Sequence, residues 1–149
     1  MTILENHQIA YKNTASKLYS FYPEEMNLAI EDFRDILIRN GYSPAGQLFF
    51  SIISDPAAEV MTAELFFPLE DLHVKPMRVE DITYRSYFCV NGMIMTRITG
   101  DFEEKSQAGY WSLLEYLQHH ELEKKTPVFV EYKQSHRGEL FAEMSVGAF

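Results

Sequence analysis

Residues 100–120 read GDFEEKSQAGYWSLLEYLQHH, residues 126–134 read TPVFVEYKQ and residues 139–146 read ELFAEMSV. The first run predicts an amphipathic helix that begins after a capping arrangement of Asp101 and Glu104. Its apolar residues recur at helical spacing, at Tyr110, Leu113, Leu114 and Leu117. The two later runs are apolar and rich in β-formers, so Asp101–Val146 predicts a helix followed by a hairpin around Ser135–Gly138.

The same order of segments occurs about 80 residues earlier in the chain. Residues 22–40 read YPEEMNLAIEDFRDILIRN, residues 47–55 read QLFFSIISD and residues 63–69 read AELFFPL. Pro23 favours a first helical turn, and Gly41 favours the end of that helix. The apolar stripe of this helix consists of Ala29, Ile30, Phe33, Ile36 and Leu37. The chain therefore predicts one supersecondary unit used twice, in halves of about 1–70 and 82–149.

The segments that precede each helix are strand-like. Residues 3–10 and 15–20 predict two short strands with a bend near Asn13. Ile82–Cys89 and Met93–Thr99 predict a hairpin, because Asn91-Gly92 is a strong two-residue turn signal. Glu70–Asp81 is polar and without periodicity, and we interpret it as the linker between halves. The fold class expected is α+β, a single domain built from a duplicated strand–helix–hairpin repeat.

Composition excludes several classes of function. The chain has 149 residues and a net charge of −9, which disfavours nucleic-acid binding and docking on an anionic membrane. No apolar run is long enough to span a bilayer, and the N-terminus lacks a signal peptide. Cys89 is the only cysteine, so an internal disulfide and a thiolate zinc site are excluded. We expect a cytoplasmic protein without a nucleic-acid or membrane partner.

Several short motifs carry a resemblance to a known family. Gly100-Asp101-Phe102-Glu103-Glu104 stands where that family shows Gly-Pro-Tyr-Glu-Glu, and the first half offers Pro44-Ala45-Gly46, Ser54-Asp55-Pro56 and Ala63–Leu69. On these residues the chain resembles the GyrI-like effector-binding domain, the ligand-sensing half of multidrug-responsive transcription regulators. The resemblance implies one curved antiparallel sheet with helices on one face.

Two further motifs, Thr126-Pro127-Val128-Phe129 and Ser86-Tyr87-Phe88, resemble a stand-alone Gram-positive branch of that superfamily. Some members of this branch lie near specialised secretion and toxin loci. No DNA-binding segment precedes the module here, so we do not expect a transcription regulator.

Strand alternation separates two faces in each hairpin. The purely apolar sets are expected to pack under the helices, while the other sets mix aromatic rings with carboxylates. These mixed sets contain Phe49, Phe66, Phe129 and Phe141 with Glu64, Glu131 and Glu143. Aromatic walls with a few carboxylates suit a flat or cationic organic ligand, and we expect its pocket where the halves meet. Alternatively, the glutamates lie on a solvated sheet surface and the phenylalanines fill the gap between the halves.

The GyrI-like resemblance implies a glutamate at the pocket floor. Glu131 fits this position best, although an alignment shifted by one residue places Val130 there and reverses the face. Tyr87 and Trp111 are further candidates for the pocket lining.

The remaining reactive side chains are expected to be structural. His119 and His120 suit the negative end of a helix, His7 and His73 look isolated, and Cys89 suits an apolar strand position. No catalytic residue, metal ligand or cofactor site is expected.

The sequence indicates three candidate functions, in order of preference. The first is a stand-alone protein that binds a lipophilic or cationic small molecule by stacking and by charge pairing with Glu131. The second is an adaptor for a protein partner in a secretion or toxin system, with a degenerate pocket. The third is a small-molecule hydrolase using Glu131 as general base. A monomer or a homodimer fits each of them.

Overall fold

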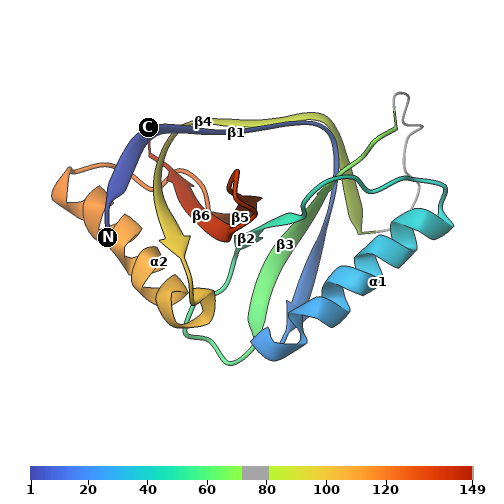
Figure 1. Cartoon of the computed structure of the whole chain (residues 1–149), viewed down its shortest axis with the longest axis horizontal. Coiled ribbons are helices and arrows are strands. Elements are labelled where there is room, and N and C mark those ends of the chain that lie inside the picture. The colour runs from blue at the N-terminus through green and yellow to red at the C-terminus, as the bar shows by residue number, and fades with distance from the viewer. Residues whose placement is uncertain (72–80, 149) are drawn as a thin grey trace. The chain divides into compact units, whose positions relative to one another are not determined.

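The computed structural model describes residues 1–71 and 81–148. Its fold class is α+β, as predicted, with antiparallel strands and two α-helices (Figure 1). The elements in chain order are β1 (Ile3–Phe21), the 3-10 turn η1 (Pro23–Glu25), α1 (Met26–Arg39), β2 (Phe49–Ile52), β3 (Met61–Pro68), β4 (Ile82–Thr99), α2 (Phe102–His119), β5 (Val128–Gln134) and β6 (Leu140–Gly147).

The chain forms two compact units. Unit 1 contains Met1–Ile9 and Cys89–Phe149, and unit 2 contains Ala10–Phe88. The long strands β1 and β4 each run from one unit into the other. Each unit has the order strand, helix, hairpin, which agrees with the predicted order. The duplication and its boundaries at 1–70 and 82–149 stay predictions.

Unit 2 is an antiparallel sheet with α1 on one face. β3 lies between β1 and β2. Pro68 of β3 pairs with Thr14 of β1, and Phe66 of β3 pairs with Phe49 of β2. The stripe predicted for α1 is buried at Ala29, Phe33 and Leu37. The ring centroid of Phe33 lies 5.6 Å from that of Phe67, so the odd-numbered residues of β3 face the helix. The opposite face holds Phe66 and Glu64.

Unit 1 has the same layering, with α2 on a sheet in which β6 lies between β4 and β5. α2 lies close to this sheet at Gly109, where an added Cβ would lie 2.9 Å from Ile98 Cδ1 and 3.0 Å from Met144 Sδ. α2 therefore covers the face of β6 that carries Met144. The predicted capping arrangement is not formed, because the Asp101 side chain makes no capping hydrogen bond. Its backbone carbonyl accepts the first helical hydrogen bond instead.

The N-terminal segment differs from the prediction of two short strands. β1 is continuous from Ile3 to Phe21, although Asn13 has a φ of 52°. Asparagine tolerates this left-handed conformation, so the chain bulges there without ending the strand. Asn13 Oδ1 accepts a hydrogen bond from the Tyr84 hydroxyl at 2.6 Å, and its Nδ2 donates to the Asp71 carbonyl at 2.9 Å.

The hairpin predicted at Asn91-Gly92 is wrong. β4 runs straight through this dipeptide from Ile82 to Thr99. A two-residue type I′ turn needs positive φ at both central residues, and only Gly92 has it, at 65°. The glycine therefore provides a local bulge in one long strand. From Met93 onward this strand pairs with β6.

Outside these elements, the predicted linker falls mostly on residues 72–80, which lie outside the described residues, as does His73. Within residues 1–71 and 81–148, no helix combines the length and the apolar character needed to cross a membrane.

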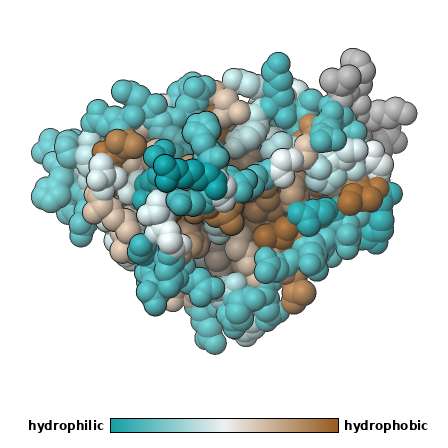
Figure 2. Space-filling view, in the orientation of Figure 1, coloured by the Kyte–Doolittle hydropathy of each residue, from teal (hydrophilic) through white to brown (hydrophobic). Residues whose placement is uncertain are grey.

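On α1 the large exposed apolar side chains are Leu28 and Ile38. Figure 2 shows brown apolar residues separated by teal hydrophilic ones over this part of the surface. Such isolated exposure is usual on a solvated helix face.

Candidate functional site

Two glutamates of unit 1 lie side by side on the sheet face opposite α2. Glu131 on β5 and Glu143 on β6 are direct cross-strand partners, and each is only 3% exposed. Because Met144 faces α2, alternation turns Glu143 to the other face, where the sequence placed it. Phe129 is buried on the same face, while Phe141 is half-buried. Two buried carboxylates in register repel one another unless cations lie close to them.

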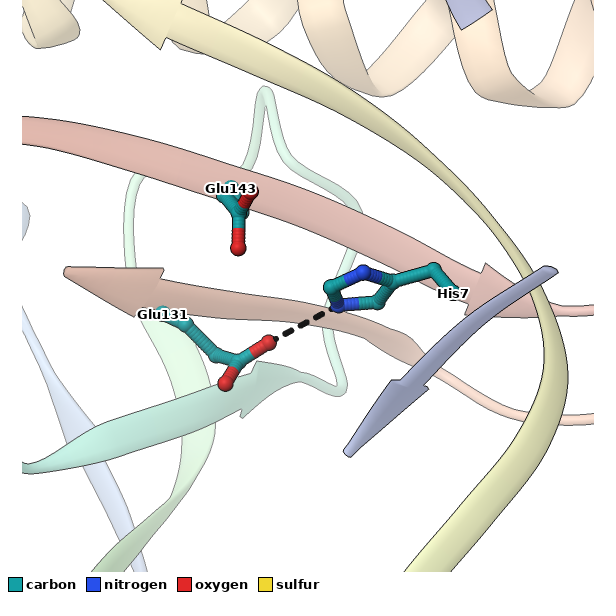
Figure 3. A group of neighbouring side chains, drawn as sticks. All are labelled: His7, Glu131 and Glu143. Carbon is teal, nitrogen blue, oxygen red and sulfur yellow. Dashed lines mark hydrogen bonds and ion pairs between the residues drawn. The ribbon is translucent and has the colours of Figure 1, made fainter. Parts of the chain in front are cut away.

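Glu131 is held by a histidine from a distant part of the sequence. His7 Nε2 and Glu131 Oε1 are 3.0 Å apart (Figure 3). Lys133 Nζ lies 3.9 Å from Glu131 Oε2. The prediction that His7 is isolated is therefore wrong. Its position 124 residues before Glu131 gives no local signal, and only the pairing of the strands brings the two together.

Glu143 is held by two basic side chains. Arg97 stands opposite it on β4 and donates from Nη2 to Oε2 at 2.8 Å, while Lys133 Nζ lies 2.5 Å from Oε1. Burial acts to raise the pKa of Glu143, but the hydrogen bonds from Lys133 and Arg97, with the charges of Lys133 and His7, outweigh it and lower the pKa below its usual range. Glu143 is therefore ionised at neutral pH.

The donor set of this cluster also has the composition of a metal site. One ligand atom from each of His7, Glu131 and Glu143 lies within 4.8 Å of the others. However, Lys133 and Arg97 already place two positive charges against the two carboxylates. A divalent cation would have to displace Lys133 from a contact of 2.5 Å. The geometry fits a neutralised ion-pair network better than a metal site.

Unit 2 contains an aromatic stack on the face opposite α1. Phe49 and Phe66 are parallel, with centroids 4.7 Å apart, and Tyr11 stacks on the other side of Phe49 at 4.7 Å. Phe88 is tilted against Phe66 at 4.9 Å. Tyr11 and Phe88 are not among the predicted site residues, and alternation along β4 is the signal that could have indicated Phe88. Tyr87, which was predicted, is 56% exposed.

Glu64 lies beside this stack with two polar partners. The Ser16 hydroxyl donates to Glu64 Oε2 at 2.6 Å, and Arg85 Nη1 lies 3.7 Å from the same oxygen. Arg85 Nη1 also donates to Ser16 Oγ at 3.0 Å. The guanidinium carbon lies 5.8 Å from the ring centroid of Phe66 and 5.7 Å from that of Phe88, within cation–π range.

A cavity of about 590 Å³ opens next to the Glu64 carboxylate. It belongs to unit 2, and its size is within the range of small-molecule sites. Its lining combines acidic, hydroxylic, basic and aliphatic residues: Ser16, Lys17, Leu18, Glu64, Asp81, Ile82 and Thr83. Of the three predicted glutamates, Glu64 is the one in the lining of this cavity.

Trp111 belongs to α2, which covers the sheet face opposite Glu131. Its indole is 45% exposed and packs edge-on against Tyr110, with centroids 5.2 Å apart. The structure thus brings Glu131, Glu143 and Phe129 onto one face of unit 1, and Phe49, Phe66 and Glu64 onto one face of unit 2. Ligand binding by any of these residues stays a prediction.

Residues 10–146 match the family described as Domain of unknown function (DUF5085). The chain belongs to this family. No curated protein matches the sequence.

Among solved structures, the chain is similar to EcmrR in an EcmrR–DNA complex, with a TM-score of 0.72, 11% identity and 98% of this chain covered. It spans 57% of the length of that EcmrR chain. The crystal structure of the EcmrR C-terminal domain gives a TM-score of 0.70 and 10% identity, with 100% of this chain and 99% of that chain covered.

Two further structures are similar over nearly the whole chain. A hydrolase from Listeria innocua gives a TM-score of 0.62 and 11% identity, covering 97% of this chain and 92% of that one. SAV2435 bound to tetraphenylphosphonium gives a TM-score of 0.51 and 12% identity, covering 98% and 94%. At such identities these likenesses show the fold alone. They support the fold that the GyrI-like resemblance implied, while membership of that superfamily and of its Gram-positive branch stays a prediction.

Proposed function

We propose that this protein is a small-molecule-binding module whose ligand is an organic cation with aromatic surface. The observation that carries the proposal is that Glu64 lines the cavity of unit 2 and lies 3.7 Å from Arg85, whose guanidinium lies over the rings of Phe66 and Phe88. The similarity to SAV2435, which was solved with tetraphenylphosphonium bound, supports the same ligand class.

The physical case for Glu64, in place of Glu131, rests on access. Both carboxylates accept a hydrogen bond, Glu131 with His7 and Glu64 from Ser16, but the Glu131 side chain is 4% exposed, whereas the Glu64 side chain is 23% exposed and lines a cavity. A cation over an aromatic face gains about 0.5 to 2 kcal/mol, more as water is excluded. A partly buried carboxylate adds charge pairing that a neutral ligand cannot use.

Titration with tetraphenylphosphonium tests this proposal. We expect Glu64→Gln to weaken binding by about five- to thirtyfold, corresponding to a loss of about 1–2 kcal/mol. Glu123→Gln is the matched control, because the Glu123 side chain is 77% exposed in unit 1 and should leave affinity unchanged. Absence of binding by the wild type, or equal affinity of the Glu64 variant, would rule the proposal out.

A second candidate function is hydrolysis of a reactive small molecule. The contact of 3.0 Å between His7 Nε2 and Glu131 Oε1 supplies the second group that the sequence did not reveal, and a hydrolase is among the similar folds. In this candidate Glu131 accepts a proton from the attacking water as general base, and His7, which it contacts, delivers a proton to the leaving oxygen. Assays with activated esters and epoxides test it: activity should be lost in both Glu131→Gln and His7→Gln. Activity that persists in either folded variant would exclude the mechanism.

The adaptor function stays a prediction. Native mass spectrometry of protein purified from its own host is the direct measurement, and recovery of only free monomer or homodimer would count against it.

A further inference from the structure

We propose that Arg85 occupies the cation position of the Glu64 site, so that a ligand must displace this side chain to bind. Arg85 would then be the residue that determines which cations the site accepts. This inference rests on the proposed function and adds to it an internal competitor that sets specificity.

The contacts of the guanidinium are those expected of a bound organic cation. It lies over two ring faces, at 5.8 Å from Phe66 and 5.7 Å from Phe88, and 3.7 Å from the Glu64 carboxylate. Planar delocalised cations of this kind stack well on aromatic rings. Arg85 thus combines stacking with charge pairing to one carboxylate.

Ser16 connects the internal cation to the cavity. Its hydroxyl is 1% exposed, accepts from Arg85 at 3.0 Å and donates to Glu64 at 2.6 Å. Ser16 and Glu64 both line the cavity. A ligand cation that reaches Glu64 from the cavity therefore meets a carboxylate whose partners are already in place.

The arginine can leave the site without burying its charge elsewhere. Its side chain is 38% exposed, so that a displaced guanidinium can hydrate. Displacement still costs the ring contacts and the charge pairing of Arg85. A small alkylammonium ion replaces the charge pairing and part of the cation–π contact, whereas an aromatic cation also covers the ring faces by stacking. Arg85 should therefore favour aromatic cations and exclude small ammonium ions.

The test compares Arg85→Met with the wild type by calorimetric titration of tetraphenylphosphonium and of tetramethylammonium. Methionine keeps an apolar stem against the rings and removes the charge. We expect tetraphenylphosphonium to bind about five- to tenfold more tightly to this variant and tetramethylammonium binding to become measurable. Arg85→Lys keeps a charge but loses the planar group, so it should show a smaller gain.

Arg97→Met is the matched control. Arg97 also lies over a ring, with its guanidinium carbon 5.0 Å from the Phe141 centroid, and pairs with Glu143, but it belongs to unit 1. Its removal should leave both affinities unchanged. Combining Glu64→Gln with Arg85→Met should abolish the gain, because the carboxylate that the ligand would reach is gone.

The outcomes separate the two proposals. If the wild type binds and Arg85→Met binds equally or more weakly, the role of Arg85 is overturned and the proposed function stands. If only Arg85→Met binds, the proposed function of the wild type is ruled out, while the role of Arg85 in blocking the Glu64 site is supported. If neither protein binds either cation, both proposals fail. A gain equal in Arg97→Met would also overturn the inference, because it would reflect net charge alone.

Discussion

Replacing Glu143 by glutamine removes the charge on which Arg97 and Lys133 converge. A hydrogen bond to a charged group contributes about 1.5–3 kcal/mol when buried. Here the basic partners are 50% and 40% exposed, so water replaces much of what they lose. Glutamine also costs less to bury than a carboxylate. We therefore expect Glu143→Gln to lower the free energy of unfolding by about 1–2 kcal/mol at neutral pH.

The pH dependence provides the sharper test. The folded-state pKa of Glu143 is lowered, so its stabilising contribution is present above the unfolded-state pKa and is lost as the pH falls through the folded-state value. The difference between wild type and variant should shrink in acid. Urea unfolding followed by Trp111 fluorescence, from about pH 7 down to about pH 3, measures it, since the stability is lost below the ordinary glutamate pKa of about 4.3.

The matched control is Glu103→Gln, at an exposed position in the first turn of α2. Its effect should stay within a few tenths of a kcal/mol. Equal stability of Glu143→Gln and wild type at neutral pH, or a difference that does not narrow in acid, would refute the account of the ion-pair network.

Three further changes test the packing and titration described above. Gly109→Ala places a Cβ against Ile98 and Met144, and overpacking should exceed the helix-propensity gain, so urea unfolding should show a loss of about 1 kcal/mol. An unchanged or higher stability would show that the two side chains yield freely. Phe33→Ala empties a fully buried site, and the same measurement should show a loss of about 3–5 kcal/mol; a loss below 1 kcal/mol would contradict its central position. Burial raises the pKa of Tyr132 to about 12, so its neutral phenol stabilises the fold below about pH 10 and this stability is lost as the pH rises toward 12. Tyr132→Phe should show a weaker decline of stability between about pH 10 and pH 12, and an identical decline would contradict the assignment.

Local periodicity allowed much of the fold to be predicted from sequence. The helix stripes and the face assignments of the hairpins depend on spacings of a few residues, and those spacings survive in the structure. Glu131 and Glu143 share a face for this reason, as do Phe66 and Glu64.

The wrong predictions concern features that depend on contacts between segments distant in the sequence. Asn91-Gly92 carries a turn signal, but pairing of β4 with β6 beyond it keeps the strand extended. His7 could not be assigned to Glu131, nor Arg85 to Glu64, because neither pair has a fixed sequence spacing. His7 comes from β1 and Arg85 from β4, and the paths of these strands follow from the whole fold.

The continuity of β1 and β4 makes the two units unequal when the chain is cut. Unit 2 is one uninterrupted segment, residues 10–88, so excising it requires only two cuts, one in β1 and one in β4. Unit 1 is joined from both ends of the chain, so excising it requires a new peptide bridge between Ile9 and Cys89. Removing only the first nine residues would take His7 away from Glu131 while leaving every covalent bond of unit 2 in place.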